Sequence, residues 1–275
     1  HAAARVLPGW GQWEDFEKTI INGTANVLKA SVENRLKRFV YVSSGSVYGK
    51  AGTGRNSKCV DENIGCDLTL NRDTYYDYSK MKAEMLVLDH NKKSNTEVTV
   101  VRPCMIYGRR CRLLTDRCYQ YAKWVPLVLP GDCKSRTAVV HASDVAECII
   151  LAAFSDKASG QIYNCAPPAS EPQCYSDFFN AMTHALGKKE LTLRIPLKLV
   201  LAFAAIMEGS ARTMHTEKSP FLTISQVRFL RDGMNIDGSK AMKELGWRQE
   251  VNMAEGCSDY VQWRRQRLNG HKKLH

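Results

Sequence analysis

Helix-like and strand-like segments alternate over the first hundred residues of the chain. Residues 14–31, "EDFEKTIINGTANVLKAS", carry apolar side chains at helical spacing, and 38–44, "RFVYVSS", is a short β-rich run. A second helix is expected at about 75–91 and a second β-rich run, "EVTVVRP", at 97–103. Because strands that alternate with helices form parallel sheets with crossover helices, the sequence predicts an α/β, doubly wound fold.

Ligands of doubly wound sheets bind beyond the carboxyl ends of the strands. Ser43 and Ser44 come at the end of the first β-rich run, and the turn 103–108 follows the second. We therefore expect the functional site at these positions. Beyond about residue 110 the alternation loosens, and helix-like stretches such as 197–213 become prominent.

Composition narrows the class of protein. The 275 residues are 44% hydrophobic and 24% charged, which are globular values. The net charge of +11 comes without interleaved aromatic residues or a recognised nucleic-acid motif. We therefore expect a solvated basic surface that attracts an anionic cofactor, and no nucleic-acid partner.

No run of about 18 uncharged apolar residues is present, so no transmembrane helix is predicted. The nearest candidate is 195–209, "IPLKLVLAFAAIMEG", and a buried core helix is the favoured interpretation. A segment that lies on a membrane is the alternative.

The ten cysteines include no CxxC pair, and their closest spacing is seven residues, so no metal site is predicted. Cys148 lies in an apolar run and is expected to be buried. This pattern favours reduced thiols and an intracellular location, cytoplasmic or membrane-associated. No signal peptide is visible, and the opening "HAAARVLPG" without an initiator methionine suggests a fragment or a processed form.

The segment 73–84, "DTYYDYSKMKAE", contains two tyrosine–lysine pairs at a spacing of four. On a helix, Tyr76 faces Lys80 and Tyr78 faces Lys82. A lysine beside a phenol lowers the pKa of the phenol and suits it to proton transfer. Helix geometry alone leaves both pairs open.

Three motifs occur in order: "VYVSSGSVYG" at 40–49, "YDYSKMKAE" at 76–84 and "VVRPCMIYG" at 100–108. Together they resemble the extended short-chain dehydrogenase/reductase family, which includes sugar-nucleotide epimerases, dehydratases and hydroxysteroid dehydrogenases. The resemblance implies a partial Rossmann-like domain over 1–165 and a smaller substrate-binding lobe over 166–275, with the two interleaved.

The resemblance also implies the roles of the site residues. It makes Tyr76 the catalytic tyrosine, with Lys80 lowering its pKa and holding the nicotinamide ribose. Ser44 would hydrogen-bond the substrate oxygen, assisted by Ser46. The cofactor would be NAD or NADP, contacted by Tyr76, Lys80 and a further set of residues: Ala2, Ala3, Ala4, Ser43, Pro103, Cys104 and Met105.

The chain departs from the family pattern at its beginning. The glycine-rich dinucleotide fingerprint and the residue that selects NAD or NADP are missing, and "HAAA" follows the fourth strand in the family. We therefore expect the first three strands and their helices to be absent, and the activity of this chain by itself is open.

The C-terminal half, with "KAMKELGW" at 240–247, looks like the 3β-hydroxysteroid dehydrogenase branch. Three functions stay open. The first is an NAD(P)-dependent oxidoreductase that interconverts a hydroxyl and a ketone on a sterol-like or other apolar substrate. The second is a nucleotide-sugar epimerase or dehydratase, and the third is a truncated, non-catalytic binding or structural subunit. The resemblance further implies a small-molecule substrate, peripheral membrane association and a homodimer.

Overall fold

A three-stranded parallel sheet forms the centre of the computed structural model. Its strands are β1 (Arg38–Val42), β2 (Glu97–Pro103) and β7 (Ile162–Cys165), in the order β1–β2–β7. In the register of the sheet, Val42 lies beside Val101, and Val101 beside Tyr163. The structure describes residues 1–6, 11–53, 58–70, 74–90, 95–112, 114–123, 127–189, 192–214, 216, 220 and 222–272.

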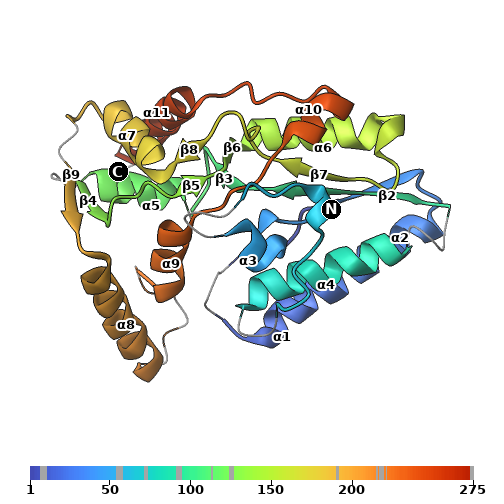
Figure 1. Ribbon diagram of the computed structural model, residues 1–275, viewed down its shortest axis with the longest axis horizontal. Coiled ribbons are helices and arrows are strands. Elements are labelled where there is room, and N and C mark those ends of the chain that lie inside the picture. The colour runs from blue at the N-terminus through green and yellow to red at the C-terminus, as the bar shows by residue number, and fades with distance from the viewer. Residues whose placement is uncertain are drawn as a thin grey trace.

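Helices cover both faces of this sheet (Figure 1). α2 (Gly23–Glu33) and α4 (Tyr75–His90) lie on one face, and α6 (Ala142–Phe154) lies on the other. The helix expected at 14–31 divides into α1 (Trp13–Phe16), a π-helical turn (Glu17–Asn22) and α2. The predicted α/β fold with a doubly wound parallel sheet is confirmed.

Shorter elements build the rest of the molecule. Two parallel pairs join β3 (Met105–Tyr107) to β6 (Val139–His141) and β4 (Leu127–Pro130) to β9 (Thr192–Ile195), and one antiparallel pair joins β5 (Arg136–Thr137) to β8 (Gln173–Cys174). The remaining helices are α3 (Gly49–Gly52), α5 (Thr115–Ala122), α7 (Tyr175–Ala185), α8 (Leu197–Thr213), α9 (Ile224–Asp232), α10 (Ser239–Leu245) and α11 (Met253–Lys272).

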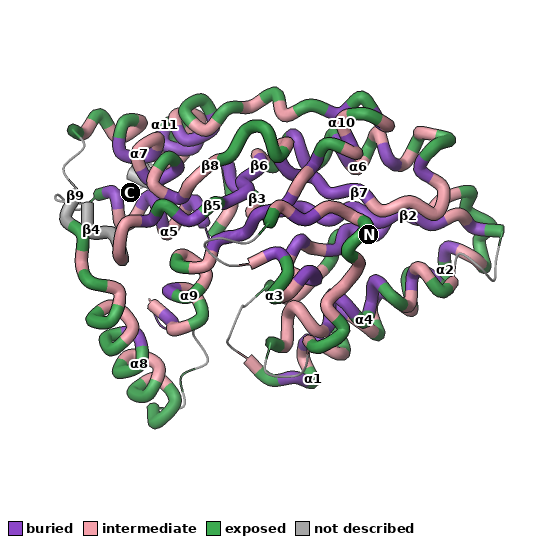
Figure 2. Tube along the Cα trace, in the orientation of Figure 1, coloured by how far each residue is buried: buried purple, intermediate pink, exposed green. Residues whose placement is uncertain are grey.

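The face of the sheet under α2 and α4 packs on large apolar side chains. Phe16, Ile20, Tyr41, Val87 and Val100 are fully buried there. Figure 2 shows the strands of the main sheet as largely buried. β2 reads as a near-continuous β-branched run because both of its faces are covered.

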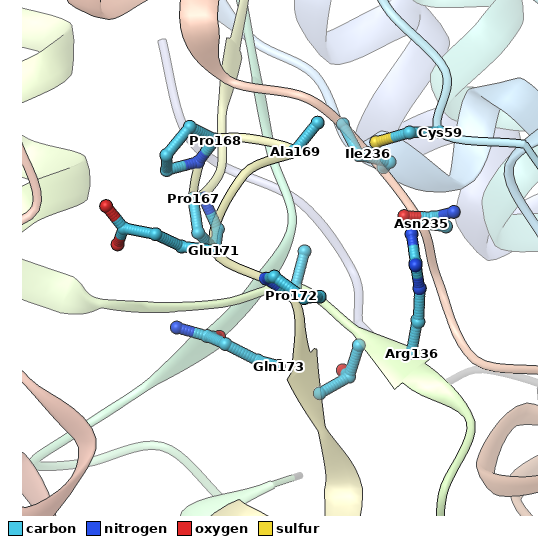
Figure 3. A pocket seen from close by; sticks show the side chains of 12 residues that line it. Cys59, Arg136, Pro167, Pro168, Ala169, Glu171, Pro172, Gln173, Asn235 and Ile236 are labelled. Atoms are coloured by element: carbon cyan, nitrogen blue, oxygen red, sulfur yellow. The ribbon is translucent and has the colours of Figure 1, made fainter.

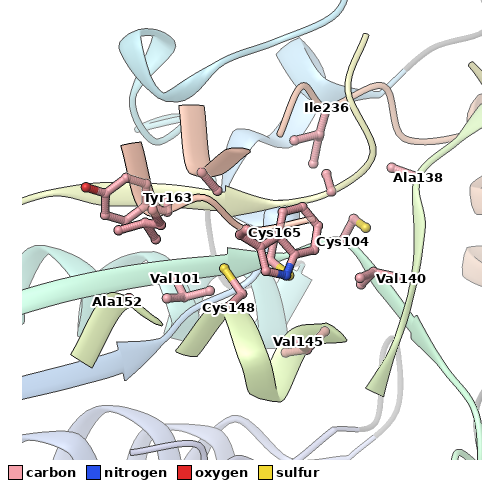
Figure 4. Packing of buried hydrophobic residues seen from close by; sticks show 14 of the residues in the cluster. Val101, Cys104, Ala138, Val140, Val145, Cys148, Ala152, Tyr163, Cys165 and Ile236 are labelled. Carbon is pink, nitrogen blue, oxygen red and sulfur yellow. The ribbon is translucent and has the colours of Figure 1, made fainter. Parts of the chain in front are cut away.

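The opposite face forms a second core, which residues from the end of the chain complete. Val101, Cys148, Tyr163 and Cys165 pack there (Figure 4). Trp247, which follows α10, belongs to the same core. The indole N–H of Trp247 donates to the carbonyl of Asp144 at 2.8 Å. Cys148 is buried, as predicted, and all ten cysteines are free thiols.

The helix expected over 197–213 is present as α8, but it is not a core helix. Ala204 is buried, whereas Leu199, Phe203 and Ile206 are 62%, 55% and 70% exposed. The favoured interpretation of this segment as a buried helix is therefore wrong, because α8 lies apart from the main sheet, which leaves these side chains uncovered (Figure 1). Among the described residues, no helix combines the length and the apolar character needed to cross a membrane.

Candidate active site

The carboxyl end of β1 carries the first site residue. Ser44 follows the strand in extended conformation, and its Oγ accepts a hydrogen bond from the amide of Ser46 at 3.2 Å. This bond begins the tight turn Gly45–Tyr48. A Cβ at Gly45 would lie 2.4 Å from the terminal methyl of Ile236, so a larger residue here would force that side chain to move.

Tyr76 lies in the first turn of α4 and meets Ser44. Desolvation raises the pKa of Tyr76 to about 12, the hydrogen bond with Ser44 opposes this shift, and the charge of Asp77 adds to it. A phenol with this pKa is protonated at neutral pH. In this structure the Tyr76 phenol therefore carries its proton and lies beside Ser44.

Lys80 lies one turn along α4, with its ammonium buried against β1. Its Nζ donates to the carbonyl of Val42 at 2.7 Å and lies 5.0 Å from the centre of the Tyr41 ring. Desolvation lowers the pKa of Lys80 to about 8, and the charge of Glu84 opposes this shift. The pKa of Tyr76 is raised, contrary to the lowering expected from Lys80, because burial dominates at Tyr76.

The second tyrosine–lysine pair lies elsewhere on the same helix. The Tyr78 ring packs on Trp13 of α1, with 5.4 Å between the ring centres. The Nζ atom of the exposed Lys82 lies 5.4 Å from the centre of the Tyr78 ring. The structure thus joins Ser44 to Tyr76 and packs Tyr78 against a neighbouring helix. This geometry favours Tyr76 over Tyr78, and the catalytic role of Tyr76 stays a prediction.

Asp77 is a site residue that sequence reasoning missed. Desolvation raises the pKa of its carboxyl to about 6, and the neighbouring Ser46 opposes this shift. Ser44 therefore lies beside Tyr76 and Ser46 lies beside Asp77, and the buried Ser46 Oγ makes no hydrogen bond among the described residues. The sequence did contain a sign of this residue, because Asp77 directly follows Tyr76 in the motif "YDYSKMKAE".

The N-terminal residues predicted to contact the cofactor lie near this end of the sheet. The amide of Val42 donates to the carbonyl of His1 at 3.0 Å, so the chain runs along the outer edge of β1. Ala2 and Ala3 are exposed and Ala4 is half-buried. Small side chains at this place leave room for a ligand to approach the main chain.

The remaining predicted cofactor contacts have partners within the protein. Pro103 ends β2, and the amides of Cys104 and Met105 donate to Cys165 and Ala138 at 3.1 and 3.0 Å. Burial raises the pKa of the Cys104 thiol. The Ser43 hydroxyl donates to Glu84 at 2.5 Å. Contact of these residues with a cofactor stays a prediction. Within the described part of the chain, no cluster of His, Cys, Asp or Glu could hold a metal ion.

Comparison with known proteins identifies the family. Residues 1–166, more than half of the chain, match the model of the NAD-dependent epimerase/dehydratase family. The chain belongs to this family. The match contains all three motifs and confirms the assignment to the extended short-chain dehydrogenases/reductases.

Curated members of the family are similar over most of this chain. A 2-alkyl-3-oxoalkanoate reductase of Shewanella oneidensis is 26% identical over 90% of this chain and 65% of its own length. A 3β-hydroxysteroid dehydrogenase/decarboxylase (isoform 1) of Arabidopsis thaliana is 26% identical over 86% of this chain and 55% of its own. The chain thus spans less than two thirds of the length of these relatives.

A solved structure of the family shows the same fold. The UDP-glucuronic acid 4-epimerase of Bacillus cereus, in complex with NAD, superposes with a TM-score of 0.67 at 21% identity. The superposition covers 95% of this chain and 72% of the epimerase. At this identity the likeness establishes the fold alone.

Proposed function

We propose that this chain carries the catalytic centre of an NAD(P)-dependent oxidoreductase that interconverts a hydroxyl and a ketone. The substrate class we propose is sterol-like or otherwise apolar. The observation that carries the proposal is the contact of Ser44 with Tyr76 at the carboxyl end of β1, one helical turn from the buried ammonium of Lys80. Family membership and the reductase and dehydrogenase relatives support it.

The residues of this site fit the nicotinamide riboside end of the proposed cofactor. An ammonium has three donors, and Lys80 directs one of them to the carbonyl of Val42 while its side chain is 2% exposed. The other donors suit ribose hydroxyls. The glycine-rich segment that binds the pyrophosphate does not occur in these 275 residues, so the fit covers one end of the cofactor.

Each side chain then has a defined task. The bound nicotinamide supplies or accepts the hydride. Tyr76 donates its phenolic proton to the ketone oxygen, or accepts the hydroxyl proton in the reverse direction. Ser44 hydrogen-bonds Tyr76 and the same substrate oxygen, and so stabilises the charge that develops there. Lys80 binds the ribose and so holds the cofactor in a fixed position relative to the Tyr76 phenol.

The test is a titration of the chain with NADH and with NADPH, followed by nicotinamide fluorescence. Lys80→Ala is expected to weaken binding, whereas Tyr76→Phe retains it and abolishes turnover of a ketone substrate. The matched controls are Lys82→Ala and Tyr78→Phe, which change the same residue types on the same helix away from Ser44.

Saturable binding that weakens in Lys80→Ala alone supports the proposal. Equal weakening in both lysine variants contradicts the assignment of Lys80. If the folded chain binds neither cofactor, the activity belongs to a longer protein, and this chain by itself acts as a binding or structural subunit.

A second function, a nucleotide-sugar epimerase or dehydratase, is favoured by one observation. A small pocket beyond the carboxyl end of β7 is lined by Arg136, Asn235, Cys59 and Pro167, and by one carboxylate, that of Glu171 (Figure 3). Among the described residues, no carboxylate forms an ion pair with Arg136. A guanidinium beside an amide suits a phosphate group. Binding of UDP that Arg136→Ala abolishes would favour this second function.

Peripheral membrane association and a homodimer stay predictions. The exposed apolar side chains of α8 support the first, because such a face suits an apolar surface.

A further inference from the structure

A fully buried ion pair joins α4 to β2 directly below the candidate site. Glu84 and Arg102 are 0% and 1% exposed. The Nε atom of Arg102 lies 3.2 Å from each carboxylate oxygen of Glu84, and its Nη2 also donates to the carboxylate. Burial of two charges is expensive even when they are paired, so a buried ion pair is weak evidence for a purely stabilising role.

The carboxylate of Glu84 also holds the end of β1. It accepts the hydroxyl of Ser43 at 2.5 Å and the thiol of Cys66 at 3.3 Å. The amide of Ser43 donates to the carbonyl of Val101 at 2.8 Å, so Ser43 is fixed by both its side chain and its main chain. The next residue in the chain is Ser44.

Arg102 extends the same network away from the site. Its guanidinium lies 4.7 Å from the centre of the Tyr48 ring, and the Tyr48 hydroxyl donates to the side chain of Asn164 at 2.8 Å. The amide group of Asn164 donates to the carbonyl of Asp237 at 3.0 Å. A continuous line of buried polar contacts therefore runs from Ser43 to the segment that returns from the C-terminal half.

We infer that Glu84 and Arg102 are positioning residues that hold Ser43 and thereby present Ser44 to Tyr76. This inference rests on the proposed function. An ionised carboxylate offers about four lone-pair sites, enough for Ser43, Cys66 and the planar guanidinium together. An apolar pair of similar volume would fill the space, but the Ser43 hydroxyl at the end of β1 would lose its hydrogen-bond acceptor.

The helix itself provides a second link to the site. Glu84 lies one turn after Lys80 on α4, and its charge opposes the lowering of the Lys80 pKa. Glu84 therefore acts on the site twice, through Ser43 on β1 and through Lys80 on its own helix.

A test independent of activity uses the chain labelled with ¹³Cζ-tyrosine. The resonance of Tyr76 is assigned from its loss in Tyr76→Phe. Ser43→Ala and Glu84→Gln are expected to shift this resonance, because Ser44 moves relative to the phenol. Ser43→Thr keeps the hydroxyl and is expected to restore the wild-type position.

The matched control is Glu97→Gln. Glu97 on β2 pairs with Arg38 on β1, at the opposite end of these strands from Ser44. Its loss is expected to leave the Tyr76 resonance unchanged. A folded Ser43→Ala whose Tyr76 resonance does not move overturns the inference, and this variant decides the matter even if Glu84→Gln fails to fold.

With a substrate in hand, the same variants separate positioning from stability. Misplacement by a fraction of an ångström is expected to lower kcat of Ser43→Ala about 10-fold to 100-fold, with KM nearly unchanged and with rescue in Ser43→Thr. A wild-type chain that binds no cofactor would contradict the proposed function. The NMR test of whether Glu84 and Ser43 position Ser44 would still be valid, because it needs no cofactor. Equal losses in Glu97→Gln would show a general effect on stability and contradict the inference.

Discussion

We expect Lys80 to lower the stability of the fold at neutral pH, and its removal should show this directly. Its ammonium is buried, with a carbonyl rather than a carboxylate as its hydrogen-bond acceptor. The pKa falls from 10.5 to about 8 because burial penalises the charged form. Lys80→Met keeps an unbranched chain of similar length and removes the charge.

The size of the effect follows from proton linkage. A fall in pKa of about 2.5 corresponds to about 3 kcal/mol at about 1.36 kcal/mol for each unit. Between pH 8 and pH 10.5 the unfolded chain binds more protons at this lysine than the folded chain. Stability therefore rises with pH in this window, and the penalty is fully present below pH 8.

The assay is urea unfolding of wild type and Lys80→Met at neutral pH and at several values up to pH 10.5. The variant is expected to be more stable at neutral pH by about 3 kcal/mol, less the contribution of the lost hydrogen bond, about 1 to 3 kcal/mol. The difference in unfolding free energy should change by about 3 kcal/mol in favour of wild type as the pH rises to 10.5. A difference that stays constant with pH would refute the reasoning, because other titrating groups cancel between the two proteins.

Three further outcomes follow from the structure. Arg102→Met should lower the unfolding free energy by about 3–5 kcal/mol because it leaves Glu84 buried without its cation, and adding Glu84→Leu should recover most of the loss; additive losses in urea unfolding would contradict this. Asp77→Asn should move the rise in the rate of hydroxyl oxidation with pH to lower pH, because the charge of Asp77 raises the pKa of Tyr76, which must lose its proton to act as the base. A rise at unchanged pH would count against this prediction. Phe203→Glu should reduce co-sedimentation with phosphatidylserine vesicles while leaving thermal unfolding unchanged, since this side chain is 55% exposed; a wild-type chain that stays in solution would refute membrane association.

The strands and helices of the main sheet could be predicted because their local patterns are strong. The β-rich runs at 38–44 and 97–103 became β1 and β2, and the helix expected at 75–91 became α4. The short strands β3 and β4 were not predicted, since three or four residues are too few to show an alternating pattern.

The environment of the site depends on contacts that no local pattern encodes. Lys80 and Glu84 both lie on the buried face of α4, where periodicity predicts apolar residues. Helical spacing therefore could not distinguish Tyr76 from Tyr78, and it gave no sign that Lys80 would bond the main chain of β1. The burial that raises the pKa of Tyr76 likewise comes from tertiary packing.

The position of Trp247 in the core of the main sheet has a consequence for dividing the chain. Met234, Ile236 and Trp247 come late in the sequence, yet they pack with Val101 and Cys148. Expression of residues 1–165 alone would leave that side of the sheet open to water and prone to aggregate. Exchange of the C-terminal half between relatives would similarly need compatible side chains on both sides of this core, so we expect the main sheet and the segments after residue 234 to fold as one unit.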